Sequence, residues 1–431
     1  MVKYILGGWR EPKYFGSRRT LLAENDYLNM PEQALSHLKV LELCNFVCGP
    51  YCTKLLADLG AEVIKIETPA MGDEARRRGP FLNDIPNSEK SGLFLYLNTN
   101  KLGITLDIET STGRNILKEL IKQSDILVED NPPKEMEELG LTYAELKKIN
   151  PHLVMTSITP FGQIGPYRNY KAFELNAVHA GGEGYMMPIE STFPTREPVK
   201  GGGLVGDCMC GLSASLATLA ASYNMKAAGM GQHVDVSKQD VLMTMVGLEV
   251  AMFTYSGMVR TRHKRKAMLA TPKECQDGYI VMSAFGDRDW QVFARFIGKD
   301  SWAEEERLNT SMKRWENSDE IDQYVETWAK KHRKDDLFHQ LQANALAGAT
   351  VNTSEDLVKS PQLKSRGFFV EIDHPKAGKL NYPSLSYNLS GTPCNAWRAA
   401  PLLGQHNEFV YCGRLGYDKQ ALVKMLEAGV I

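Results

Sequence analysis

A regular alternation of short β-rich runs and helical segments between residues 38 and 158 constrains the fold most. Helical segments such as PYCTKLLADLG, which ends at Gly60, and TYAELKKIN, with Thr142 and Glu145 at capping-box spacing, separate the runs. Alternating strands and helices form a parallel sheet with crossover helices. We therefore expect a doubly wound α/β layer. Its strands are LKVLEL (38–43), AEVIKIE (61–67), DILVED (125–130) and LVMTSI (153–158).

The 431-residue chain is too long for one ordinary core, so we expect two domains. After about residue 255 the pattern changes to aromatic-rich and charged helices, and past residue 350 it returns to strands and turns. The expected organisation has three parts. They are the first part of a large domain (1–225, with an N-terminal arm 1–35), a linker with a small α+β domain (226–345), and a return to the large domain (346–431).

Composition excludes several classes of function. The formal net charge is -2, which gives no general attraction to nucleic acid or to an acidic membrane. No apolar run reaches the ~18 residues of a membrane span, and the N-terminal apolar run is too short for a signal peptide. The eight cysteines show no metal-binding spacing, and Cys44, Cys48 and Cys52 are interpreted as buried small hydrophobes. We expect a cytoplasmic protein without a metal.

Two motifs have weak functional alternatives. Gly201, Gly203 and Gly206 match GxGxxG, but the preceding FPTREPVK reads as a loop, so a flexible glycine turn near a ligand is favoured over NAD binding. The basic run between Arg260 and Lys266 is either a solvated face or a clamp for a phosphorylated ligand. It lacks interleaved aromatic residues, so nucleic acid is not expected as a partner.

One carboxylate stands out. Glu174, in KAFELNAVHAGG (171–182), lies between Phe173 and Leu175 at the start of a short apolar stretch that ends in Gly181 and Gly182. It is either a first-turn residue favoured by the helix dipole or a nucleophile.

Five stretches occur in the order typical of the family III (CaiB/BaiF) CoA-transferases, and the chain resembles that family from about residue 36 to 415. The resemblance implies a Rossmann-like large domain, a smaller domain and two chains interlocked as rings. It also implies transfer of coenzyme A from an acyl-CoA donor, such as succinyl-CoA, to a free carboxylic acid through an enzyme-acyl anhydride and an enzyme-CoA thioester. The stretches are GPYCTKLLADLGAEVIKIETPAMGDEAR, NTNKLGITLDI, SDILVEDNPPKEMEELGLTYAELKKINPHLVMTSITPFGQIGPY, GMGQHVDVSKQD and APLLGQHN.

The same resemblance implies the site residues. The family nucleophile is an Asp just before an apolar stretch that ends in Gly, and Glu174 is interpreted as holding that place. Glycines shield the anhydride from water, and either Gly201, Gly202 and Gly203 or the segment 181–184 could serve. The expected CoA contacts are Arg76, Arg77, Arg78, Lys101 and Lys134.

Three departures from the family pattern suggest an alternative. Glu174 is one methylene longer than Asp, which shifts the attacking oxygen by about an ångström and costs roughly 100-fold if the pocket does not compensate. Leu102 and Pro132 replace two cations expected near CoA, and Lys134 replaces a Gly. In this alternative, the chain is the degenerate partner in a heterodimer or heterotetramer and does not form a self-sufficient homodimer.

Two further readings concern the reaction and the acid. An acyl-CoA racemase of the same fold would carry two histidines where this chain has Glu135 and Phe173, so that reading lacks its bases. The acceptor acid is expected to be apolar or aromatic, from the apolar residues Trp9, Phe173, Tyr185, Met186 and Met187.

Overall fold

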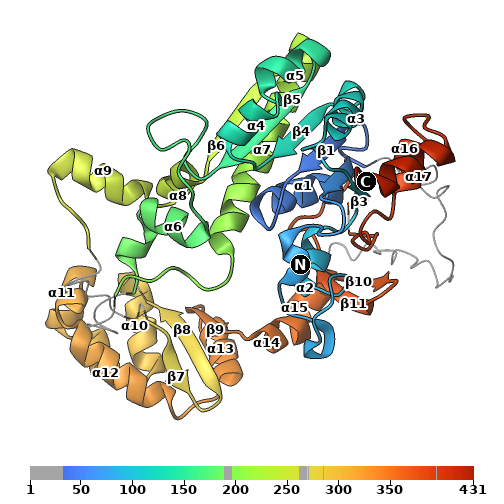
Figure 1. Ribbon diagram of the computed structural model, residues 1–431. Coiled ribbons are helices and arrows are strands. Elements are labelled where there is room, and N and C mark those ends of the chain that lie inside the picture. Colours follow the sequence, from blue (N-terminus) through green and yellow to red (C-terminus); the bar gives the residue numbers. More distant parts are fainter. Residues whose placement is uncertain (1–32, 189–196, 262–268, 270, 285, 395) are drawn as a thin grey trace, which may run out of the picture.

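The computed structural model describes residues 33–188, 197–261, 269, 271–284, 286–394 and 396–431, so most of the expected N-terminal arm, Trp9 and the basic residues 262–266 lie outside the described residues. A six-stranded, fully parallel sheet forms the large domain (Figure 1), in the order β3-β2-β1-β4-β5-β6. This confirms the predicted doubly wound sheet. The strands are β1 Lys39–Leu43, β2 Glu62–Glu67, β3 Leu102–Thr105, β4 Ile126–Glu129, β5 Val154–Thr159 and β6 His233–Ser237.

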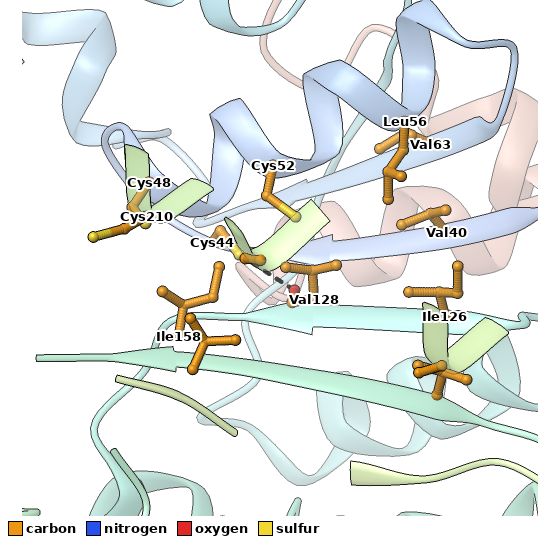
Figure 2. Packing of buried hydrophobic residues seen from close by; sticks show 14 of the residues in the cluster. Val40, Cys44, Cys48, Cys52, Leu56, Val63, Ile126, Val128, Ile158 and Cys210 are labelled. Atoms are coloured by element: carbon orange, nitrogen blue, oxygen red, sulfur yellow. Dashed lines mark hydrogen bonds between the residues drawn. The ribbon is translucent and has the colours of Figure 1, made fainter. Parts of the chain in front are cut away.

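Helices cover both faces of this sheet because its strands are apolar on both sides. One face packs on a core that includes Cys44, Cys48 and Cys52, shown in Figure 2, so their interpretation as buried small side chains is confirmed. The other face packs on a second aliphatic core with Ile116 and Leu146. The helices of this part are α1 Cys48–Asp58, α2 Gly92–Leu97, α3 Ser111–Lys122, α4 Pro133–Glu138, α5 Tyr143–Ile149, α6 Glu174–Ala180, α7 Val205–Ala228, α8 Lys238–Met245 and α9 Gly247–Ser256.

Two local features differ from the sequence expectations. Leu102, interpreted as a ligand-facing position, lies in β3 and is 2% exposed in the second core. β3 was not recognised because it has four residues and follows a polar stretch. The expected capping box of α5 does not form, since the Thr142 side chain makes no cap hydrogen bond.

The small domain lies apart from the large sheet (Figure 1) and has its own core around Trp290 and Trp302. It contains an antiparallel sheet in the order β7-β8-β9. Since β6 belongs to the large sheet and β9 to the small one, both domains continue past the expected boundaries at 225 and 345. The elements are β7 Lys273–Cys275, β8 Gly278–Ser283, α10 Asp287–Phe296, α11 Ser311–Glu316, α12 Ser318–Ala329, α13 Lys334–Ala343 and β9 Ala347–Val351.

The C-terminal part returns to the large domain and packs on the edge strand β3. The Gly103 N–H donates to His406 Nδ1 at 3.0 Å, and the Thr105 N–H donates to Asn407 Oδ1 at 2.9 Å. The elements are α14 Ser354–Lys359, α15 Pro361–Ser365, β10 Phe369–His374, β11 Gly378–Pro383, α16 Asn407–Tyr411 and α17 Lys419–Glu427. Short 3-10 turns include η2 Glu74–Arg77, η3 Leu82–Asp84, η4 Glu183–Met186, η5 Asp300–Ala303 and η6 Glu306–Leu308.

Among the described residues, one helix, α7, is long enough and apolar enough to cross a membrane by length and composition alone. Half of its apolar window is buried inside the protein. It packs on α1, β5 and α8. These contacts are those of a core helix of the large domain.

Candidate active site

Glu174 is the first residue of α6 and is 8% exposed, whereas its neighbours Phe173 and Leu175 are 66% and 53% exposed. The carboxylate therefore points inward while the flanking apolar side chains point outward. Its Oε1 accepts a hydrogen bond from the Gly206 N–H at 3.0 Å. Because Gly206 belongs to α7, the Glu174 side chain joins α6 to α7.

Lys200 holds the second oxygen of Glu174, with Nζ 3.0 Å from Oε2. The same ammonium donates to the carbonyl oxygens of Gly201, at 3.0 Å, and Gly203, at 2.5 Å. Both carboxylate oxygens of Glu174 are thus occupied, and the glycine segment is tied to the same point.

Asp207 is a second buried carboxylate at the same place, in the first turn of α7 and next to Gly206 in the chain. It is 3% exposed, and its Oδ1 lies 2.9 Å from Lys238 Nζ. Within the described part of the chain, no hydrogen bond to its Oδ2 is found. Burial, followed by the negative charges of Asp207 and Glu174, raises the pKa of the Cys208 thiol to about 11.

Analysis of the sequence missed Asp207. The signal was present, because Asp207 follows Gly206 and precedes CMC, an apolar stretch that ends in Gly211. That is an Asp before an apolar stretch ending in Gly, without the substitution needed at Glu174. Lys200 and Lys238 were also missed, since their partners lie on distant segments.

The three glycines 201–203 are exposed and precede α7. Gly203 has a φ of +72°, which favours glycine, and nothing lies within 4 Å of a Cβ built at Gly202 or Gly203. At Gly206, by contrast, a Cβ would lie 2.7 Å from Val178 Cγ2 and 3.2 Å from Glu174 Oε1. Gly206 is therefore required for the close approach of α6 and α7.

Lys238, the partner of Asp207, lies at the carboxyl edge of the large sheet. Lys238 directly follows β6, and Asp130 directly follows β4. Burial lowers the pKa of Lys238, but the acidic groups Cys48, Asp207 and Asp130 together raise it above its ordinary value. Burial raises the pKa of Asp130 well above its usual range, against the lowering effect of Lys238. Ligands of doubly wound sheets bind at this carboxyl edge.

Arg76 is enclosed within the protein and is 1% exposed. Its guanidinium binds Glu67 at 2.6 and 2.8 Å, Glu89 at 2.8 Å and the Pro401 carbonyl at 3.0 Å, and it lies 3.6 Å above the centre of the Phe94 ring. These contacts join β2 to the C-terminal part of the chain and serve the fold.

Lys101 is also fully buried, with Nζ 2.8 Å from Glu42 Oε2 and 2.8 Å from the Pro50 carbonyl. Burial lowers the pKa of Lys101 to about 8, although Glu42 opposes that shift. Like Arg76, Lys101 faces the interior of the sheet and its crossovers rather than the carboxylate pair.

The remaining expected CoA contacts are more open. Arg77 and Arg78 are exposed at η2, where Arg77 donates to the Met71 carbonyl and Arg78 pairs with Glu74 at 2.7 Å. Lys134 lies in the first turn of α4 with its side chain 71% exposed, 3.7 Å from Glu138. The structure thus brings Glu174 and the glycine segment together and leaves the cations distributed elsewhere.

The model of CoA-transferase family III matches residues 35–407, so the chain belongs to this family. That confirms the resemblance. The chain is 29% identical to the succinyl-CoA–D-citramalate CoA-transferase of Chloroflexus aurantiacus, over 92% of this chain and 98% of that one. It is 30% identical to the formyl-CoA:oxalate CoA-transferase of Streptomyces coelicolor, over 93% and 100%.

One solved structure of a CaiB/BaiF family protein, from Brucella suis, superposes with a TM-score of 0.78 at 27% identity and covers 89% of this chain and 100% of that one. The fold class and the family thus agree with the sequence expectation. Relatives named as CoA-transferases support the transfer of CoA as the general class of activity.

Proposed function

We propose that this chain moves coenzyme A from an acyl-CoA donor, such as succinyl-CoA, to a free carboxylic acid. The carrying observation is the pair of buried carboxylates, Glu174 and Asp207, each held by one lysine at the carboxyl edge of the sheet. A carboxylate oxygen attacks the thioester carbon, the carbon–sulfur bond breaks, and the electron pair leaves with the CoA thiolate. The thiolate then attacks the resulting anhydride to release the acid and leave CoA on the enzyme carboxyl.

Asp207 is the better candidate for the nucleophile. Its Oδ2 has no hydrogen bond within the described residues, whereas Oε1 of Glu174 accepts a hydrogen bond from Gly206 and its Oε2 is ion-paired with Lys200. An oxygen that does not have to break a hydrogen bond needs less free energy to attack the thioester carbon. Asp207 also has the side-chain length that the family pattern requires, so no compensation for an added methylene is needed. Glu174 then positions α7 through Gly206.

Trapping the acyl-enzyme decides between the two carboxylates. The chain is incubated with an acyl-CoA and then with hydroxylamine or borohydride, and the modified peptide is identified by mass spectrometry. We expect modification at Asp207, loss of transfer in Asp207→Asn, and a smaller loss in Glu174→Gln. The exposed Asp240 of α8 supplies a matched control, and Asp240→Asn should keep full activity. Modification at Glu174 alone would restore the reading in which the glutamate is the nucleophile.

The acceptor acid is proposed to be apolar or aromatic. Phe173, Tyr185 and Met187 lie in or beside α6 and η4 with exposed fractions of 66%, 52% and 41%, which provides apolar surface on these two elements. A panel of acids that compares oxalate, aliphatic dicarboxylates and aryl-substituted acids tests this. Preference for oxalate would contradict it.

A second candidate function is that of one subunit in a hetero-oligomer. Helix α9 has no buried residue, and Leu248, Phe253 and Tyr255 are 65%, 55% and 97% exposed. Such a surface requires a partner. One relative, 29% identical, is the BbsE subunit of the succinyl-CoA:(R)-benzylsuccinate CoA-transferase of Thauera aromatica. We propose an interlocked dimer in the cytoplasm. Native mass spectrometry combined with assay of the purified chain distinguishes a self-sufficient homodimer, which transfers CoA alone, from an inactive subunit.

A further inference from the structure

Lys200 connects three parts of the site. Its ammonium is within 3.0 Å of Glu174 Oε2 and of the Gly201 carbonyl, and it also binds the Gly203 carbonyl. The side chain is 22% exposed, so it lies at the boundary between the buried carboxylates and solvent. No other cation is seen on Glu174 among the described residues.

The site holds two negative and two positive groups in matched pairs. Lys238 is paired with Asp207 at 2.9 Å, and Lys200 with Glu174 at 3.0 Å. Removal of Lys200 would leave a carboxylate that is 8% exposed without its cation, one residue from Asp207 through the Gly206 N–H. A like charge close by disfavours the ionised form of a carboxyl group, and an unpaired buried charge is costly.

The glycine segment depends on the same lysine. Nothing in the described structure lies within 4 Å of a Cβ built at Gly202 or Gly203, and the segment is exposed. Two hydrogen bonds from one ammonium to backbone carbonyls therefore hold these glycines next to the carboxylates. Backbone with few packed neighbours gains most of its order from such bonds.

We propose that Lys200 is a positioning residue for CoA transfer, which keeps the buried Glu174 carboxylate paired with a cation and which holds Gly201–Gly203 next to it. This inference rests on the proposed function. When the anhydride forms, the negative charge of Asp207 leaves with the CoA thiolate. The charge of Glu174 does not change, so Lys200 keeps its partner throughout the reaction. Lys200 therefore acts through Glu174 and the glycines.

The test compares Lys200→Met, Lys200→Arg and the double variant Lys200→Met/Glu174→Gln. The matched control is Lys226→Met, since Lys226 is an exposed lysine on α7. For Lys200→Met we expect kcat to fall about 10-fold or more with the KM for acyl-CoA changed less than about 2-fold, as for an interaction needed after binding. The acidic limb of the pH profile of kcat should move to higher pH, because Glu174 is more easily protonated once its cation is removed.

The double variant gives the sharpest result. Removing the glutamate charge together with its lysine should return the acidic limb towards that of the wild type, and Lys200→Arg should retain most activity. If the activity losses of the two single substitutions simply add in the double variant, the proposal is overturned, because the effects of residues that act through one another are not additive. A wild-type pH profile and kcat in Lys200→Met would overturn it as well.

Hydrogen exchange of the Gly206 amide, followed in a peptide covering residues 197–211, is a readout that does not need activity. Exchange should accelerate in Lys200→Met but not in Lys226→Met, with thermal melting used to verify that each variant is folded. Unchanged exchange overturns the structural half of the inference. Absence of CoA transfer by the wild-type chain, with accelerated exchange in Lys200→Met, would instead refute the proposed function.

Discussion

The close approach of α6 and α7 at Gly206 can be tested by a single added methyl group. In Gly206→Ala the new Cβ would lie 2.7 Å from Val178 Cγ2, well inside ordinary contact, and 3.2 Å from Glu174 Oε1. Val178 is 2% exposed and β-branched, so it cannot move away easily. Overpacking of this kind costs about 1–3 kcal/mol.

Replacing glycine by alanine within a helix also stabilises the protein by up to about 1 kcal/mol through backbone entropy. The control variant must therefore include this stabilisation without the steric clash. Gly247, the first residue of α9, provides it, because nothing lies within 4 Å of a Cβ built there. We therefore expect Gly206→Ala to be less stable than Gly247→Ala by about 1–3 kcal/mol. For a domain of this size that difference is roughly 2–12 °C in Tm.

Differential scanning fluorimetry and urea unfolding measure the stability, and a CoA-transfer assay measures the effect on the site. Activity should fall by up to about 100-fold, because the methyl group displaces the Glu174 carboxylate and the start of α7. Adding Val178→Ala should restore part of the stability relative to the sum of the single variants. Equal stability of Gly206→Ala and Gly247→Ala, with full activity, would refute the reasoning that α6 and α7 meet at this glycine.

Three further perturbations address other parts of the fold. Arg76→Met should lower the free energy of unfolding by about 3–5 kcal/mol in urea titrations, because it leaves Glu67 buried without its cation; a change below about 1 kcal/mol would contradict this. Burial raises the pKa of Glu129 from 4.5 to about 7, so the folded state binds the proton more tightly and stability should fall as pH rises from 4.5 to 7. Glu129→Gln should flatten that slope in unfolding curves at pH 5 and 8. Burial lowers the pKa of His406 from 6.5 to about 4, so its contribution should be lost as pH falls from 6.5 to 4. Because neutral His406 accepts the Gly103 N–H, His406→Ala should remove this acid dependence, and an unchanged acid profile would contradict the assignment.

The large domain could be predicted because its strands are separated by helices of clear period, and each strand signal is local. β3 could not, since its four residues follow the polar NTN and are identified only by pairing with β2. Lys101 and Arg76 were expected at a ligand because the family resemblance implied CoA contacts there. Their burial depends on Glu42 and Glu67, which meet them only in the folded sheet.

Part of the candidate site was expected from the sequence, and part is seen only in the fold. Glu174 lies where the sequence expectation put it, beside the glycine segment. Asp207 was overlooked within a helix of small residues, and Gly206 is 32 residues from Glu174 in the chain. No local pattern indicates that Glu174 accepts the Gly206 N–H, so the second carboxylate emerged only from the packing of α6 on α7.

The proposal that Asp207 is the nucleophile weakens the case for a degenerate subunit. That case rested on three departures, and two of them have structural explanations: Glu174 need not attack if Asp207 does, and Leu102 is a core residue of β3. The third is at Pro132 and Lys134, which are exposed at the start of α4. The exposed apolar side chains of α9 fit the proposed dimer, and a second copy of the same chain can cover them. With its two carboxylates and their two lysines on one chain, the self-sufficient homodimer is the simpler hypothesis.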